Sequence, residues 1–263
     1  MNIEKKFEKD GYIKVLGDKD CLEYLRNSLI DNILKVTKIK FPKDLNKEDF
    51  LNNFHKYIKK NNLNEVRFAF YNKLNLDLKF QDYYYQSCKK YLDCIVGNEL
   101  AMQKKINLSI QIPNDKNSLL DMHSDIYAGE SPFQIVVWIP MVNVYKTKAM
   151  FFTDPKTSKK LNHNILNFNK NTIKQLYYKN KTKFKFLDAK FGEIIIFSPI
   201  ILHGNTINIT DESRFSLNCR FKSLLSPYDV TVKSHRNIPN FYRPLTIKPM
   251  TKIGFNYLKK YSV

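Results

Sequence analysis

The sequence predicts an α+β protein whose helices come first and whose β-strands follow. Over residues 22–33, apolar side chains recur three and four positions apart, which is the spacing of an amphipathic helix. From Lys104 onward apolar residues alternate with polar ones, which is the period of a half-buried strand. The length of 263 residues is sufficient for one large domain with a well-buried core. These observations favour a single unit in which helices pack on a β-rich core.

The first hundred residues are expected to be mainly helical. A short edge strand at 11–15 precedes a helix that Asp18 or Asp20 can cap. This helix should end at Phe41-Pro42, and its apolar stripe, which we expect to pack on a sheet, consists of Leu22, Leu25, Leu29 and Ile33. Further helices are expected at 47–60, 64–74 and 80–96.

Strands are expected to make up most of the second part of the chain, at 106–112, 133–142, 147–153, 194–197 and 214–221. In the first of these, Asn107, Ser109 and Gln111 share one face, which suits either a polar pocket or a solvated surface. In the last, one face carries Arg214, Ser216, Asn218 and Arg220. The polar segment 154–182 is expected to be an insertion or a lid, and the proline-rich tail from 223 should be extended.

The charge of the chain is its one unusual compositional property. It contains 44 Lys+Arg against 25 Asp+Glu, which gives a net charge of +19. Such a balance can indicate a nucleic-acid partner or acidic substrates. Because the lysines are spread over every segment, we favour a general compositional bias over a nucleic-acid surface. An anionic small substrate is compatible with both interpretations.

The cysteines and the apolar runs indicate a reduced protein without a membrane span. Cys21, Cys88, Cys94 and Cys219 form no C-x-x-C pair and have no zinc spacing, so we expect buried, reduced thiols. No apolar stretch approaches twenty residues, and the chain does not open on a secretory signal pattern. We therefore expect a cytoplasmic protein.

Three residues form a candidate metal site. His123 and Asp125 lie two positions apart and project from the same face if the segment is extended. His203 follows 80 positions later, at the end of a β-branched apolar run. Two imidazoles and a carboxylate are the facial ligand set of non-haem iron(II), which leaves three positions open. His-x-Asp alone is a weak motif, and a lone histidine is more often structural, but the combination favours the metal.

An arginine and a serine beyond His203 form a candidate carboxylate site. Arg214 lies 11 positions after His203, and Ser216 shares its face of the predicted strand. An arginine fork can hold a carboxylate through two parallel hydrogen bonds, and a serine hydroxyl can add a third. Arg220, on the same face, is a second candidate or a substrate-binding cation. A salt-bridged or surface arginine is the alternative for both.

Several segments together resemble the iron(II)/2-oxoglutarate oxygenases of the phytanoyl-CoA dioxygenase type. They are Asn107 to Pro113, Leu120-Asp-Met-His123-Ser-Asp125, Ser131 to Val142, Thr147 to Met150 and His203-Gly-Asn205. More narrowly, they resemble the subgroup found sporadically among carbohydrate biosynthesis genes. The resemblance covers roughly residues 100–222 and, loosely, the opening segment 9–15.

This resemblance implies a double-stranded β-helix, that is, a cupin-like jelly roll, with N-terminal helices packed on its major sheet. It implies one oxygenase domain, 1–263, with a mainly helical part at 1–100, a jelly-roll core at 101–222 and a C-terminal extension at 223–263. The implied cofactor is iron(II), bound by His123, Asp125 and His203. The implied cosubstrate is 2-oxoglutarate, used together with O2, for which Arg214, Ser216, Asn107, Gln111 and Arg220 are the candidate binding residues.

The expected activity is hydroxylation of a small molecule, and the resemblance points to a sugar or sugar nucleotide used in a surface polysaccharide. Desaturation or ring closure would use the same site. Two other classes of function stay open. One is a non-catalytic jelly roll that binds carbohydrate or nucleic acid, and the other is an oxygenase that acts on a macromolecule. The sequence leaves the oligomeric state undetermined.

Overall fold

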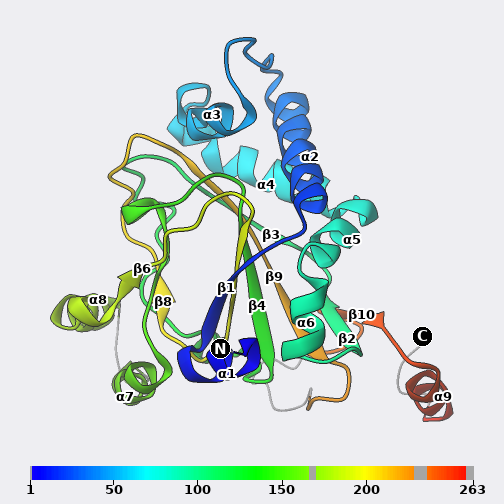
Figure 1. The fold of residues 1–263 in the computed structure, drawn as a ribbon. Helices are drawn as coiled ribbons and strands as arrows, with labels where there is room; N and C mark the ends of the chain where they lie inside the picture. The colour runs from blue at the N-terminus through cyan, green and yellow to red at the C-terminus, as the bar shows by residue number, and fades with distance from the viewer. Residues whose placement is uncertain (1, 166–169, 228–235, 259–263) are drawn as a thin grey trace.

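The computed structural model describes residues 2–165, 170–227 and 236–258 (Figure 1). Within these ranges seven strands form a mainly antiparallel major sheet in the order β1-β7-β4-β9-β2-β10, and β3 also pairs with β9. The strands are β1 (Tyr12–Leu16), β2 (Leu100–Gln103), β3 (Asn107–Gln111), β4 (Gln134–Pro140), β7 (Glu193–Phe197), β9 (Arg214–Ser223) and β10 (Tyr242–Thr246). β1 is an edge strand, as expected from the sequence.

A second, minor sheet consists of three short strands in the order β6-β5-β8. They are β5 (Phe151–Phe152), β6 (Lys185–Phe186) and β8 (His203–Gly204). Two helices, α7 (Pro155–Ile165) and α8 (Lys170–Lys179), lie beside this sheet (Figure 1). Leu161 and Tyr177 of these helices join a small apolar cluster with Phe151 and Leu202. The polar segment 154–182 is therefore largely helical and packs on the minor sheet.

The remaining helices cover one face of the major sheet or lie at its ends (Figure 1). They are α1 (Ile3–Asp10), α2 (Lys19–Thr37), α3 (Lys47–Asn52), α4 (Leu63–Asn75), α5 (Leu78–Gln86), α6 (Lys89–Ile95) and α9 (Pro249–Tyr257). Asp18 caps α2 by accepting a hydrogen bond from the Cys21 amide. The predicted stripe of α2, which consists of Leu22, Leu25, Leu29 and Ile33, is fully buried.

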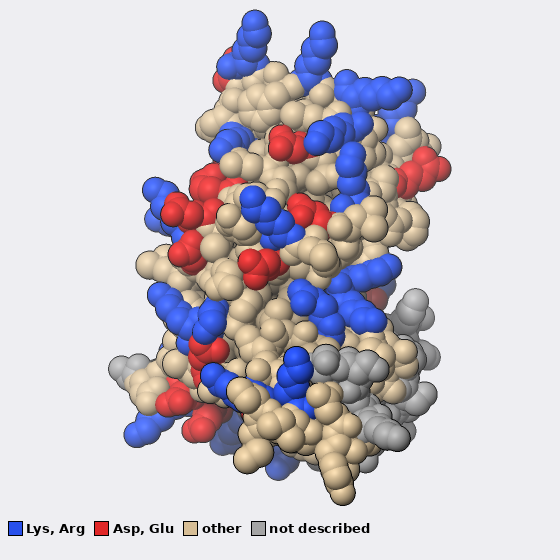
Figure 2. Space-filling model, turned by 90° about the vertical axis from the view of Figure 1, so that its right-hand side faces the viewer, with Lys and Arg blue, Asp and Glu red and all other residues tan. Residues whose placement is uncertain are grey.

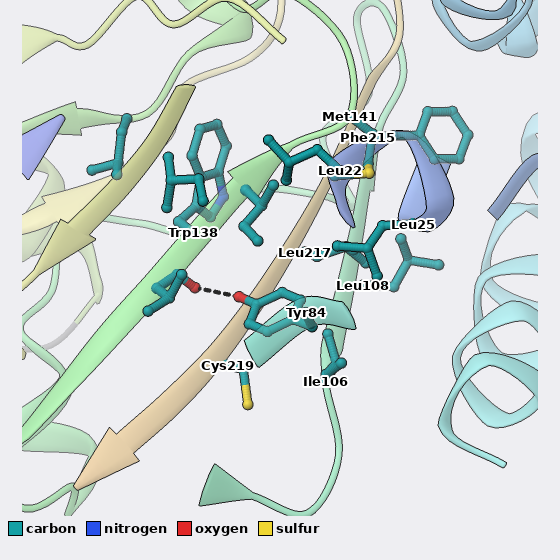
Figure 3. Close-up of a cluster of buried hydrophobic side chains, with 14 of the residues drawn as sticks. Leu22, Leu25, Tyr84, Ile106, Leu108, Trp138, Met141, Phe215, Leu217 and Cys219 are labelled. Atoms are coloured by element: carbon teal, nitrogen blue, oxygen red, sulfur yellow. Dashed lines mark hydrogen bonds between the residues drawn. The ribbon is translucent and has the colours of Figure 1, made fainter. Parts of the chain in front are cut away.

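The core lies between this helical layer and strands β4 and β9 (Figure 3). Leu22 and Leu25 of α2 approach Leu217 of β9, and Tyr84 of α5 lies over the same strand. The buried Tyr84 hydroxyl donates a 2.7 Å hydrogen bond to the carbonyl of Val137 in β4. Because this bond satisfies a polar group that burial would otherwise leave unpaired, the helical layer is held at one position on the sheet.

Two predicted helices are shorter than expected because tertiary contacts use their carbonyl groups. The helix predicted at 47–60 ends at Asn52 and continues as a 3-10 turn, since the Asn52 carbonyl accepts from the Ser213 amide. The helix predicted at 80–96 divides into α5 and α6, since the Ser87 carbonyl accepts from the Asp18 amide. A long-range hydrogen bond has replaced a helical one in both places.

Three other expectations are wrong in part. Of the strand predicted at 147–153 only Phe151–Phe152 is a strand, because residues Lys146–Lys148 form a 3-10 turn. The tail from 223 contains strand β10 and helix α9, so it is not simply extended. Cys88 and Cys219 are buried, but Cys94 is exposed on α6 and Cys21 is half-buried.

No helix in the described ranges combines the length and the apolar character that crossing a bilayer requires.

Candidate active site

The two histidines are brought together by the backbone. The amide and carbonyl of His123 exchange hydrogen bonds of 2.9 Å with those of His203, which lies in β8 of the minor sheet. Ser124 is extended, so Asp125 turns to the same side as His123, while the Ser124 hydroxyl donates to the carbonyl of Pro199. One ligand atom from each of His123, Asp125 and His203 lies within 4.8 Å of the others. The predicted triad is therefore assembled between the two sheets.

Both imidazoles are oriented for metal binding by backbone carbonyls. Nδ1 of His123 lies 2.8 Å from the carbonyl of Asp121, and Nδ1 of His203 lies 3.0 Å from that of Ile201. A carbonyl can only accept, so each Nδ1 carries the proton and each Nε2 keeps a free lone pair. These Nε2 atoms lie 3.4 and 3.8 Å from one Asp125 oxygen. Ligands held about 2.1 Å from one ion at right angles are roughly 3 Å apart, so only a small contraction is needed.

The protonation states of the site also suit a cation. Burial lowers the pKa of His203 to about 4, so the imidazole is neutral at physiological pH. Burial alone would raise the pKa of Asp125, but its contacts with His123, His203 and the charged Arg220 hold this pKa well below its ordinary value. The set thus offers a carboxylate and the neutral imidazole of His203, which are forms that bind iron(II).

A buried charge network extends from the triad. Arg220 lies 3.2 Å from the second oxygen of Asp125 and 3.6 Å from Glu130. Glu130 also pairs with Arg236, and Arg220 donates to Gln103 at 3.2 Å. Burial would lower the pKa of Arg220, but Asp125 and Glu130 raise it. Arg220 is therefore a salt-bridged arginine beside the triad, which is the alternative that the sequence left open.

Arg214, the candidate carboxylate ligand, is fully buried in β9 and has few partners. Its two hydrogen bonds, to the carbonyl of Lys148 and the hydroxyl of Ser109, are long at 3.3 and 3.4 Å. Its Nε atom has no partner, and no ion pair joins it to another described residue. Burial lowers its pKa to about 10, so it still carries its charge at neutral pH. Arg214 is therefore a buried cation that no carboxylate of the described residues balances.

Other unpartnered polar atoms lie on the same inner face as Arg214. The Ser216 hydroxyl is buried, and neither it nor the side-chain oxygen of Gln111 has a partner among the described residues. Gln111 is the cross-strand neighbour of Arg214, and Ser109 is that of Ser216, so their side chains share one face. Buried polar groups are normally satisfied, and a bound carboxylate would accept hydrogen bonds from Arg214 and from the Ser216 hydroxyl. The residues present therefore fit 2-oxoglutarate.

The other two candidate residues, Asn107 and Gln111, each donate a hydrogen bond within the chain. Asn107 donates to Asn218 at 2.9 Å, and Gln111 donates to the carbonyl of Thr206 at 2.7 Å. Three residues near the site were missed from the sequence as site candidates: Gln103, Glu130 and Arg236. Glu130 lies five positions after Asp125, yet nothing in its local pattern indicates burial. Only the fold brings it to Arg220.

Comparisons with known proteins agree with this geometry. No family model matches the chain. An alignment of 170 positions, which covers 57% of this chain, is 27% identical to human peroxisomal phytanoyl-CoA dioxygenase and covers 47% of that enzyme. The match thus spans about half the length of this curated relative.

Solved structures of non-haem oxygenases share the fold. The nickel complex of the non-haem monooxygenase ThoJ superposes with a TM-score of 0.56 at 13% identity, over 98% of this chain and 95% of that one. Iron-bound EctD from S. alaskensis gives 0.51 at 12% identity, over 94% and 87%. HygX from Streptomyces hygroscopicus, with nickel and 2-oxoglutarate bound, gives 0.50 at 11% identity, over 86% and 88%.

The architecture is therefore the double-stranded β-helix, as expected from the sequence. Its antiparallel sheets hold a His-x-Asp and a distant histidine at one point. The chain thus shares its fold with solved non-haem oxygenases and brings two histidines and a carboxylate together, and its sequence is similar to human phytanoyl-CoA dioxygenase.

Proposed function

We propose that this protein is an Fe(II)/2-oxoglutarate-dependent dioxygenase that hydroxylates a small molecule. The observation that carries the proposal is the pairing of a two-histidine, one-carboxylate cluster with an uncompensated buried arginine in the same barrel. In the net reaction the substrate C–H, 2-oxoglutarate and O2 become C–OH, succinate and CO2. One oxygen atom enters the substrate and the other enters succinate, so no further reductant is required.

The proposal assigns His123, Asp125 and His203 as the ligands of iron. Iron(II) and 2-oxoglutarate, when bound, supply the chemistry that activates oxygen. Arg214 and Ser216 would hold the distal carboxylate of 2-oxoglutarate. Gln111, whose amide nitrogen donates to the carbonyl of Thr206, would line the same polar wall. Arg220 would fix the orientation of Asp125, since it contacts the carboxylate oxygen that is turned away from the imidazoles.

Apolar side chains enclose His203 and would exclude bulk water from the metal. The ring of Phe152 lies 5.7 Å from that of His203, nearly parallel to it, and Phe197 meets it edge-on at 4.8 Å. Exclusion of water on this side strengthens the electrostatic contacts within the site and protects it from side reactions. Open access would then lie on the side of Arg220 and Asn107.

Our proposal for the substrate class rests on the sequence resemblance and on the charge of the chain. A sugar or a sugar nucleotide, used in a surface polysaccharide, stays our proposal, supported by the likeness of residues 100–222 to the carbohydrate-cluster subgroup. The basic character of the chain is compatible with an anionic compound. Free thiols at all four cysteines favour a reducing compartment such as the cytoplasm.

A macromolecular substrate is the rival, and one face of the surface argues against it. Figure 2 shows Lys and Arg interspersed with Asp and Glu on the side formed by α2, α5 and β10. Proteins that track a nucleic-acid backbone present a basic stripe or patch instead. A nucleic-acid substrate would also show an affinity that falls steeply with salt concentration.

Anaerobic binding tests the cofactor assignment without knowledge of the substrate. Iron(II) and then 2-oxoglutarate are added to the purified protein, and the weak visible absorption band of the keto-acid chelate is recorded. We expect a band in the wild type, none in His123→Ala, and a 2-oxoglutarate Kd raised about 10- to 100-fold in Arg214→Gln, which loses charge-assisted hydrogen bonds of roughly 1.5–3 kcal/mol.

The control for this experiment is Arg67→Gln. Arg67 is also partly buried and donates to the carbonyl of Ile110 and the hydroxyl of Ser118, but the proposal gives it no ligand. The affinity of the Arg67→Gln variant for 2-oxoglutarate should match that of the wild type. A wild-type protein that binds neither iron nor 2-oxoglutarate would instead support a non-catalytic binding jelly roll.

A further inference from the structure

A cavity of about 260 Å³ lies against Arg220 and has a strongly basic lining. Tyr71 of α4, Lys104 and Lys105 of the turn between β2 and β3, and Phe241 before β10 contribute to it. Arg236 and three carboxamide side chains complete the wall, and none of its described lining residues is acidic. The cavity is therefore rich in hydrogen-bond donors and in positive charge.

The charges of this cavity do not cancel. The two arginines are balanced by Asp125 and Glu130, with which they form ion pairs. Lys104 and Lys105 are exposed, and neither forms an ion pair with any residue of the described ranges. Two positive charges thus face the cavity without a counterion from the described chain. A doubly charged anion would neutralise them.

Aromatic rings fix two of these cations at the cavity. Nζ of Lys105 lies 5.6 Å from the ring centroid of Tyr71, and the guanidinium of Arg236 lies 4.3 Å from that of Phe241. Such contacts reduce the side-chain entropy lost when a ligand binds. Burial raises the pKa of Tyr71, so its hydroxyl stays protonated and can donate as well.

Arg220 connects the cavity to the triad. Arg220 lines it and also lies 3.2 Å from Asp125. Arg214 is not among the lining residues, so the cavity is separate from the pocket assigned to 2-oxoglutarate. Its volume is below the roughly 300–1,000 Å³ of pockets that enclose a whole drug-sized ligand. It suits one end of a substrate whose other end reaches the metal.

We infer that this cavity binds a phosphate group of the substrate, and that the enzyme acts on a phosphorylated small molecule. The inference rests on the proposed function, because it names the substrate class of the same site. Lys104 and Lys105 supply the uncompensated charge, and the carboxamides and Tyr71 supply neutral donors. Arg220 and Arg236 remain paired with Asp125 and Glu130. Phosphate is preferred over a monocarboxylate because two charges are uncompensated.

The experiment measures binding of inorganic phosphate to the protein without iron or 2-oxoglutarate, by calorimetry at fixed ionic strength. The test variant is Lys104→Gln/Lys105→Gln. The matched control is Lys159→Gln/Lys160→Gln, because these neighbouring lysines of α7 are also exposed and the change in net charge is the same. We expect the Kd for phosphate to rise about tenfold in the test variant and less than about twofold in the control.

Two further measurements distinguish failure of this inference from failure of the dioxygenase assignment. Arg214→Met should bind phosphate as the wild type does, because the anion does not occupy the 2-oxoglutarate pocket. Acetate should bind at least tenfold more weakly than phosphate, in line with the loss of one charge. Any one of four results would overturn the inference. They are loss of phosphate binding in Arg214→Met, equal effects of the two double lysine substitutions, equal affinity for acetate and phosphate, and no phosphate binding in the wild type. None of these readouts depends on catalysis, so failure of the dioxygenase assignment would be seen separately.

Discussion

Arg214 carries a buried charge that no carboxylate in the described part of the chain balances. A protein of this size is stable by only a few kcal/mol, so an unpaired buried cation is a substantial cost. The simplest physical reason to keep it is a ligand that supplies the missing anion. This residue therefore connects the stability of the fold with the binding of the cosubstrate.

Methionine has a length similar to that of arginine but no charge. Replacing Arg214 by methionine should remove the cost of the buried charge and also the binding of the cosubstrate. We expect the free energy of unfolding of the ligand-free protein to stay unchanged or rise by about 1–3 kcal/mol, since an apolar side chain replaces a buried charge. The stabilisation that 2-oxoglutarate gives to the wild type, about 2.7 kcal/mol at 100 times its Kd, should disappear. Urea unfolding with and without 2-oxoglutarate measures both quantities. A ligand-free variant that is markedly less stable than the wild type would mean that Arg214 is structural.

The two-residue strand β8 shows how a small element determines the geometry of the site. It pairs with β5, and its first residue, His203, bridges to His123. Gly204 allows this close packing, because a Cβ at that position would lie 2.8 Å from the carbonyl oxygen of Leu120 and 2.8 Å from the ring of Phe151. A backbone oxygen cannot move aside without moving the segment that leads to His123.

The variant Gly204→Ala should therefore weaken both the fold and the metal site. We expect a loss of about 1–3 kcal/mol in the free energy of unfolding, as for other overpacked positions, together with weaker iron binding. The control is Gly254→Ala in α9, where a Cβ would meet nothing within 4 Å. It should raise the stability by about 0.5–1 kcal/mol, because alanine favours a helix over glycine. Equal stability of the two variants would contradict this account of β8.

At the scale of the whole molecule the net charge of +19 opposes compactness. Like charges spread over the surface repel one another, and the folded state brings them closer together than the unfolded chain does. Figure 2 shows acidic side chains among the basic ones on one face, which relieves part of this repulsion. The remainder should respond to ionic strength.

Added salt should stabilise this protein. The screening length falls from about 30 Å at 0.01 M to about 8 Å at 0.15 M, so the long-range repulsion is largely removed over this interval. We expect the Tm to rise by a few degrees, which for a chain of this size corresponds to a gain of about 1 kcal/mol in the free energy of unfolding. Thermal unfolding in sodium chloride measures the change, and in sodium phosphate the Tm should rise further if the cavity beside Arg220 binds the anion. A Tm that falls with sodium chloride would show that local ion pairs outweigh the overall repulsion.

Properties that depend on local periodicity and on residue type could be predicted from the sequence. The stripe of α2, the cap at Asp18, the alternation of β3 and β9 and the ligand types at His123, Asp125 and His203 could all be recognised from neighbours in the chain. Those patterns report which face of an element is buried, because burial repeats with the period of the element. They also indicated Arg214 and Ser216 as a pair on one face.

Only the tertiary structure decided which elements end early and which charges meet. The carbonyls of Asn52 and Ser87 end helices because partners from distant segments reach them. Arg220 binds Asp125 and Glu130, while Arg214 remains unpaired, although both arginines lie on the same face of β9. The physical reason is that a strand pattern specifies the direction of a side chain but not what lies opposite. The opposing residues come from positions scattered over the chain, and their distances are set by packing alone.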